Sequence, residues 1–337
     1  MEEMILNIIH TGLERCYDMY GREIPCQGTG QDAAFKLGVP WPAPRFSVLS
    51  HDLVRDELTN LEWSRKANFF DFPLTWQETL DEIKKLNREG FDGYSDWRLP
   101  NRREMRSIIS HGQRKPALAE GHPFTDVFLG WYWTSTTSAL APGYAWYVHL
   151  EGARMFYGGK EQRYLAWPVR GNSRHIPRTG QSECYDSRGE VITCSGTGQD
   201  ADINAGHPWP VPRFNRQGLE VTDHLTGLIW HDPEVFAGQA VNWQQALDMV
   251  QQLKGGNEWR LPNINELESL VDASAHSPAL PSGHPFTGLE DGYWSSTTSF
   301  FEPDWGYVLY LRKGAVGVGC KPGPEFRVWP VRSLHSR

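Results

Sequence analysis

The clearest hydrophobic pattern in the chain is a helical stripe that follows the same strand-like motif in two places. Residues 97–105 read WRLPNRREM, and residues 259–267 read WRLPNINEL. In both, a proline ends a short strand, an asparagine suits a helix N-cap, and Glu104 or Glu266 stands at the third helical position. Apolar residues then recur at helical spacing, at Met105, Ile108, Ile109, Leu267, Leu270 and Val271. This spacing predicts a helix with one face on a core.

A second helix is predicted ahead of each motif. Thr75 with Glu78, and Asn242 with Gln245, have the spacing of a capping box. The apolar stripe that follows is formed by Trp76, Leu80 and Ile83 in one copy and by Trp243, Leu247 and Val250 in the other. Each copy is therefore expected to contain two short helices.

Alternation with a period of two predicts strands in the second half of each copy. One face is expected to be buried and to carry Trp146, Val148, Leu150, Tyr307, Leu309 and Leu311. The other face is left with Tyr147, His149 and Tyr310. The Trp-rich runs 132–137 and 293–298 predict a central strand, whereas the proline in 167–170 and 329–332 predicts an edge strand or a bulge.

The two copies are an internal duplication. Residues 11–46 and 179–214 run in constant register, with an offset of 168 (184 − 16 for the cysteines). We therefore expect two α+β modules, 10–171 and 178–333, each with two short helices and a small, mostly antiparallel sheet. A chain of 337 residues has room for two such modules.

Composition excludes two classes of partner. A net charge of −8 and a sequence pI near 5.8 argue against nucleic acid, because phosphate binding needs concentrated Lys and Arg. No apolar run approaches the roughly 20 residues of a membrane-spanning helix. The first residues, MEEMILNII, are acidic where a secretory signal is basic, so no export signal is visible.

The cysteines indicate an oxidising compartment. Nine residues separate Cys16 from Cys26, nine separate Cys184 from Cys194, and Cys320 has no counterpart. We expect one disulfide per copy, each stabilising its small loop by about 2–3 kcal/mol. Such bonds persist in secreted, periplasmic or cell-surface proteins. An export signal is then expected to have been removed or to lie outside this chain.

Catalytic and metal-binding patterns are weak. The chain has neither a His-Glu-x-x-His nor a Cys-x-x-Cys sequence, so we expect no enzymatic activity and assign no catalytic or metal-binding residue. Residues 200–204, DADIN, resemble the start of a calcium loop, but Ala205 and Val211 stand where its glycine and glutamate belong. A solvated loop is the favoured interpretation, no cofactor is expected, and a calcium ion is left open.

The positions at which the two copies differ in sequence favour a ligand-binding function. Residues 138–144 read SALAPGY, and their counterparts 299–305 read SFFEPDW. A constant frame with variable aromatic loops suits recognition, because Trp and Tyr offer large rigid surfaces with a polar edge. The candidate contacts are Tyr144, Tyr147, His149, Arg154, Trp305, Tyr310, Arg312 and Lys313.

Several motifs, in the right order, resemble the Lcl C-terminal domain family. They are the segments 184–186, 196–200, 225–230, 259–267, 293–298 and 331–332. The resemblance covers nearly the whole chain in two tandem copies. It implies a C-type-lectin-like fold, related to the formylglycine-generating-enzyme group, and an extracellular adhesive role with glycan binding in the best-studied member. That bacterial adhesin has a collagen-like stalk, which this chain lacks, and the family supplies no catalytic residues.

These observations predict a secreted or surface protein that binds a glycan or a protein on another surface. One alternative is a structural subunit of a surface assembly, in which the aromatic residues serve self-association into a homo-oligomer. Another is an enzyme of the formylglycine-generating group. That chemistry needs reactive cysteines late in the module, where only Cys320 lies.

Overall fold

The computed structural model describes residues 8–253 and 259–333, and they form two compact α+β units. The central unit comprises Trp41–Pro208 with Asp272–Ser274. The terminal unit joins Met1–Pro40 to Trp209–Val271 and Ala275–Arg337. The expected fold class, a pair of α+β modules with small antiparallel sheets, is confirmed.

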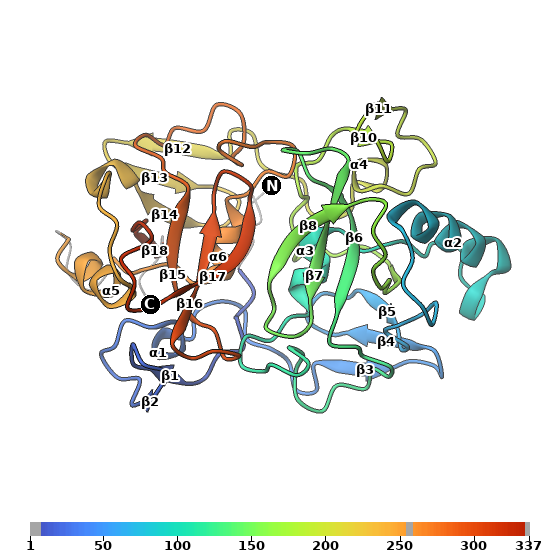
Figure 1. Cartoon of the computed structure of the whole chain (residues 1–337), viewed down its shortest axis with the longest axis horizontal. Helices are drawn as coiled ribbons and strands as arrows, with labels where there is room; N and C mark the ends of the chain where they lie inside the picture. Colours follow the sequence, from blue (N-terminus) through green and yellow to red (C-terminus); the bar gives the residue numbers. More distant parts are fainter. Residues whose placement is uncertain (1–7, 254–258, 334–337) are drawn as a thin grey trace. The chain divides into compact units, whose positions relative to one another are not determined.

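The units interleave the two sequence repeats. Residues 8–40 pack with the second repeat, as Figure 1 shows for the blue β1, β2 and α1 beside the orange-red β15–β17. We call residues 8–40 the terminal lobe and residues 172–208 the central lobe. Each unit thus combines the lobe of one repeat with the remainder, or body, of the other. The boundaries 10–171 and 178–333 remain a prediction about the repeats, whereas the spatial units are divided differently.

Each lobe is a small hairpin followed by one helical turn. The elements are β1 (Cys16–Tyr17), β2 (Glu23–Ile24) and α1 (Asp32–Phe35) in the terminal lobe, and β10 (Cys184–Tyr185), β11 (Val191–Ile192) and α4 (Asp200–Ile203) in the central lobe. The predicted disulfides are confirmed, as Cys16–Cys26 and Cys184–Cys194. Cys320 is a free thiol.

Removing the disulfide of the terminal lobe tests its contribution to stability. We expect the double variant Cys16→Ser, Cys26→Ser to lose about 2–3 kcal/mol of unfolding free energy, because the unfolded chain regains the freedom that the closed loop removes. Urea denaturation under non-reducing conditions measures the loss. Cys320→Ser is the control, and an equal loss in that variant would contradict a role specific to the disulfide.

Each body contains two antiparallel sheets. In the central unit they are β3 (Phe46–Val48), β4 (Leu53–Asp56), β5 (Glu62–Ser64) and β9 (Val169–Arg170), and then β6 (Trp131–Thr137), β7 (Tyr144–His149) and β8 (Met155–Gly159). In the terminal unit they are β12 (Phe214–Gln217), β13 (Glu220–Asp223), β14 (Leu228–His231) and β18 (Val331–Ser333), and then β15 (Gly292–Thr298), β16 (Trp305–Tyr310) and β17 (Ala315–Cys320).

The strand predictions are confirmed in one case and wrong in another. The proline-containing segments end in the edge strands β9 and β18. The Trp-rich strands β6 and β15 were expected to be central, but each pairs along its length only with β7 or β16 within its unit. They are nevertheless buried, because later loops cover their free edges through the bridges Tyr132–Leu165 and Tyr293–Arg327.

The helices begin where their caps predict. They are α2 (Trp76–Glu89), η1 (Phe91–Gly93) and α3 (Arg102–Ser107) in the central unit, and η2 (Pro233–Phe236), α5 (Trp243–Gln251) and α6 (Ile264–Ser269) in the terminal unit. Capping boxes start α2, α3, α5 and α6, and the predicted apolar stripes are buried. The lobes add the turns α1 and α4, so each unit contains more helix than expected.

Glu104 and Glu266 do more than begin a helix. Each carboxylate makes two hydrogen bonds of 2.6–2.7 Å to a buried arginine, Arg98 or Arg260, and also accepts from the backbone N–H of the N-cap asparagine. Both partners of each pair are nearly excluded from solvent. The Trp-Arg-Leu motif is therefore tied to the following helix by a buried, bidentate ion pair.

Candidate functional site

The three-stranded sheet of the central unit has one buried face and one face that is partly open. Trp146, Val148 and Leu150 are buried on the first face, as the alternation predicts. On the second face, Tyr147 and His149 are half-buried. The same alternation holds in the terminal unit, with the exception that Val308, the counterpart of Tyr147, is fully buried.

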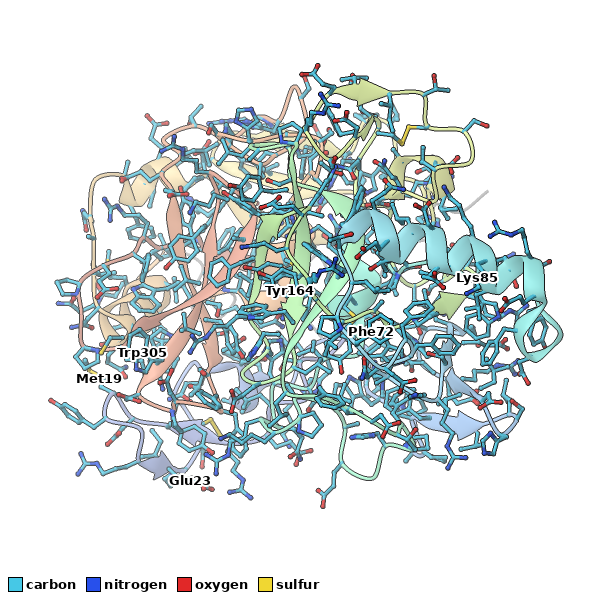
Figure 2. The ribbon with its side chains drawn as sticks, turned by 45° about the vertical axis from the view of Figure 1, so that its right-hand side comes forward. Met19, Glu23, Phe72, Lys85, Tyr164 and Trp305 are labelled. Carbon is cyan, nitrogen blue, oxygen red and sulfur yellow. A yellow bond between two sulfur atoms is a disulfide. The ribbon has the colours of Figure 1, made fainter. Side chains whose placement is uncertain are left out.

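The partly open face of the central unit carries five half-buried aromatic side chains beside Trp133, which lies opposite Tyr147 and is fully buried. Cross-strand pairing places His149 opposite Trp131 and Phe156 opposite Tyr147. Directly opposite residues project from the same face of a sheet. Tyr164 joins them through ring contacts with Tyr147, and Figure 2 shows it in front of the green strands. We call Trp131, Tyr147, His149, Phe156 and Tyr164 the aromatic face.

Four of the five rings, those of Trp131, Tyr147, His149 and Tyr164, form a continuous series of contacts. The centroid of Trp131 lies 4.3 Å from that of Tyr147 and 4.2 Å from that of His149. Tyr147 and Tyr164 are 4.8 Å apart, with planes inclined by 62°. All five side chains are half-buried. Because this packing already restricts the rings, little side-chain entropy is lost when a ligand stacks on them.

Polar atoms border these rings. The hydroxyl of Tyr164 donates to Oε1 of Gln162 over 3.0 Å, and Nδ1 of His149 is bonded to the carbonyl oxygen of Glu151. Burial, followed by the proximity of Tyr164, raises the pKa of Tyr147 to about 12. The Tyr147 hydroxyl is therefore protonated at neutral pH and interacts with the neighbouring hydroxyl of Tyr164. An apolar surface edged by polar groups suits a ligand that is itself amphipathic.

The eight candidate residues do not form one site per unit. Tyr144 and His149 stand at opposite ends of β7, roughly 17 Å apart at the usual rise per residue. Only Tyr147, His149 and Arg154 lie together, because the N–H of His149 donates to the carbonyl of Arg154 over 2.9 Å. Tyr144 is exposed at the other end of the strand.

The candidates of the terminal unit are similarly divided. Trp305 begins β16, whereas Tyr310 ends it. Arg312 and Lys313 are exposed in the turn between β16 and β17. Tyr310 packs on Phe326 with a centroid separation of 5.7 Å. These four side chains therefore mark the two ends of one strand.

The lobes contact the loops that vary between the repeats. Gly21, at the hairpin tip of the terminal lobe, lies so close to Pro303 and Asp304 that a Cβ would be 2.9 Å from the Asp304 nitrogen. Gly189 of the central lobe meets Pro142 and Gly143 in the same way. Figure 2 labels Met19 and Trp305 in this region of the terminal unit. The variable loops are thus partly covered by a hairpin.

A buried lysine holds each lobe in place. In the central unit Nζ of Lys160 donates to the carbonyls of Tyr185 and Asp186, both over 3.1 Å, and lies 4.2 Å from the Trp76 ring centroid. Lys321 does the same in the terminal unit, donating to two carbonyls of the terminal lobe over 3.3–3.4 Å. These lysines are 1% and 0% exposed, and burial lowers the pKa of each to about 7.

A buried aspartate makes the second attachment of each lobe. Asp200 accepts from the hydroxyls of Thr136 and Thr179 over 2.6 and 2.8 Å, and Asp32 accepts from Thr11 and Thr297 over 2.8 Å. Burial raises the pKa of both carboxyls to about 6. The expected solvated loop is therefore wrong for Asp200, because that residue begins α4 and lies 3% exposed.

Asp202, the other carboxylate of this segment, forms hydrogen bonds with backbone N–H groups. It accepts from the N–H groups of Gly196 and Gly198. Among residues 8–253 and 259–333, no group of three or more His, Cys, Asp or Glu side chains is placed to hold a metal ion.

The comparison with protein families decides the relationship. The Lcl C-terminal domain matches residues 52–170 and again residues 219–332, which together exceed half of the chain. The chain belongs to the Lcl C-terminal domain family. No curated protein matches it. In the described part of the chain, no helix is long and apolar enough to cross a membrane.

The two matches of the Lcl C-terminal domain begin after the lobes, so they cover the bodies. The aromatic face lies wholly in the first match. The sequence candidates do not include Trp131, Phe156 or Tyr164, because they were chosen in and after the variable loops. The signal for these residues is their change between the copies, where the counterparts are Gly292, Gly317 and Phe326.

Proposed function

We propose that this member of the Lcl C-terminal domain family is a non-enzymatic binding protein that recognises a glycan through its aromatic face. The observation that carries the proposal is a series of four contacting, half-buried rings on β6, β7 and the loop after β8, with Phe156 of β8 paired opposite Tyr147. Its ligand is expected on another surface, such as a cell or an extracellular polymer. The disulfides in both lobes support a secreted, periplasmic or cell-surface location.

Sugar rings match this arrangement chemically. One side of a pyranose ring presents C–H groups that stack on an aromatic ring, and its hydroxyls reach polar atoms at the edge. Trp131 and Tyr147 offer the stacking surface, while Gln162 and the tyrosine hydroxyls supply edge contacts. Large aromatic side chains dominate binding energies because they bury much area with few rotamers to restrict.

The state of Cys320 favours binding over formylglycine-type catalysis. Burial, together with the nearby Asp304 and Glu325, raises the pKa of this thiol. A raised pKa lowers the fraction of thiolate, which is the reactive form. We propose no cofactor for the binding reaction, and the effect of a chelator on binding tests whether calcium is required.

A glycan array tests the proposal, run with calcium and repeated with a chelator. We expect a reproducible set of related hits that survive chelation. Trp131→Ala is expected to weaken binding of those hits about 30-fold, the effect of losing roughly 2 kcal/mol at an aromatic hot spot. Fluorescence titration with the strongest arrayed glycan measures the change.

Tyr20→Ala is the matched control, because Tyr20 is 71% exposed in the terminal lobe and outside the aromatic face. An equal loss of glycan binding in both variants would show that binding is not specific to the aromatic face. A blank array with folded protein would rule out glycan recognition and favour a protein ligand or self-association, which light scattering at increasing concentration would detect.

A further inference from the structure

The two units present the same face of their three-stranded sheets with different side chains. Both sheets share one cross-strand register, so positions correspond one to one. The counterparts of Trp131, Tyr147, His149, Phe156 and Tyr164 are Gly292, Val308, Tyr310, Gly317 and Phe326. Three of the five aromatic positions are therefore glycine or valine in the terminal unit.

Phe326 fills the space that these small residues leave. Phe326 is 9% exposed, and its ring centroid lies 4.8 Å from that of Trp294. A Cβ on either Gly292 or Gly319 would overlap this ring. The backbone of Phe326 is held by pairing with Val241. The phenylalanine therefore lies directly on the sheet, in a close-packed position.

Tyr164 occupies the corresponding position differently. Its backbone pairs with Leu74, as that of Phe326 does with Val241. Its ring contacts Trp133 at 4.7 Å, but the Trp131 side chain stands where the terminal unit has Gly292. Tyr164 remains half-buried with its hydroxyl on Gln162. The central unit thus keeps partly open rings where the terminal unit has a closed core.

Two charged residues beside the aromatic face are held in ion pairs. Arg163, next to Tyr164, pairs with Glu78 over 2.8 Å, and Glu151, near His149, pairs with Lys115 over 3.1 Å. A sulfated or phosphorylated chain would require an excess of positive charge, and the protein carries −8. A neutral glycan has no such requirement.

We propose that the chain has one binding site for a neutral oligosaccharide, on the aromatic face of the central unit, and that Phe326 closes the equivalent site of the terminal unit. This inference rests on the proposed glycan-binding function and adds its stoichiometry and its ligand class. The terminal unit then has a structural role and no glycan site of its own.

Isothermal titration calorimetry on the full chain tests the inference. The probes are cellohexaose and chitohexaose, two neutral hexasaccharides, and a heparin-derived hexasaccharide as their anionic counterpart. We expect one equivalent of a neutral probe per chain, about 30-fold weaker binding in Trp131→Ala, and unchanged binding in Tyr310→Ala. Tyr164→Ala serves as a second variant of the site, and circular dichroism verifies that each variant is folded.

The outcomes separate this inference from the function on which it rests. Two equivalents per chain, or weaker binding in Tyr310→Ala, would overturn the single site while leaving glycan recognition intact. Preference for the heparin-derived probe, or array hits without binding of either neutral probe, would overturn the ligand class. A blank array would overturn the proposed function and this inference together.

Discussion

Replacing Glu266 by alanine is expected to lower the free energy of unfolding by about 3–5 kcal/mol. The substitution leaves the Arg260 guanidinium buried without its bidentate carboxylate, and it also leaves the N–H of Asn263 without an acceptor. An unpaired buried charge costs far more than the pair contributes, because its solvation is not replaced. Urea denaturation followed by circular dichroism measures the loss.

Glu78 provides a matched control for this prediction. It also sits at the third position of a capping box and pairs with an arginine, Arg163, but that pair is exposed to solvent. Glu78→Ala is therefore expected to lower the free energy of unfolding much less than Glu266→Ala does, because solvent screens the exposed pair. Equal losses in the two variants would show that the helix cap, and not the buried ion pair, determines the cost.

The free energy of unfolding is expected to rise between pH 7 and pH 10. The pKa of Lys160 and of Lys321 is about 7 in the folded chain, against 10.5 for an ordinary lysine. In this interval the unfolded chain binds more protons than the folded chain, so increasing pH favours folding. Each pKa unit corresponds to about 1.4 kcal/mol, and we expect a total rise on the order of a few kcal/mol.

The buried aspartates act in the opposite direction at lower pH. The folded-state pKa of Asp32 and Asp200 is about 6, against 3.8 ordinarily. Between these values the folded chain binds more protons than the unfolded chain. The stabilisation that the aspartates contribute to the free energy of unfolding is therefore fully present below pH 3.8 and is lost as the pH rises through 6. Together with the lysines, they predict a minimum in stability between pH 6 and pH 7.

Nearby carboxylates also affect the pKa of the two buried lysines. Asp18 and Asp304 lie near Lys321, and Asp186 lies near Lys160. Urea denaturation at half-unit intervals from pH 4 to pH 10 measures the curve. The double variant Lys160→Met, Lys321→Met is expected to remove the rise above pH 7. An unchanged rise in that variant would place its origin elsewhere.

Local elements were predictable because their causes are local. Asn101 and Asn263 cap their helices as the motif indicates, since the capping acceptor and donor lie within three residues. The buried stripe of α2 follows from helical periodicity, and the Cys16–Cys26 pair follows from two matched spacings. The family relationship also depended only on the order of such motifs.

Partners distant in sequence were not predictable. Asp32 receives a hydrogen bond from Thr297, 265 residues away, and Lys321 reaches the carbonyl of Tyr17 across 304 residues. In each of these pairs, the two residues belong to different repeats. The repeat pattern by itself suggested instead that each lobe packs on the body of its own repeat. Nothing in the local sequence distinguishes that arrangement from the observed exchange, because the repeats have the same contact residues.

The duplication, the strand and helix types, the disulfide pairs and the family could be predicted from the amino-acid sequence, because each depends on periodicity or on short, repeated spacings. Which lobe joins which body, and which aromatic residues share a face, became apparent only in the folded chain. It split Tyr144 from His149 along β7, and it joined His149 to Trp131. Strand register and long-range packing bring such residues together, and neither is encoded in any local stretch of the chain.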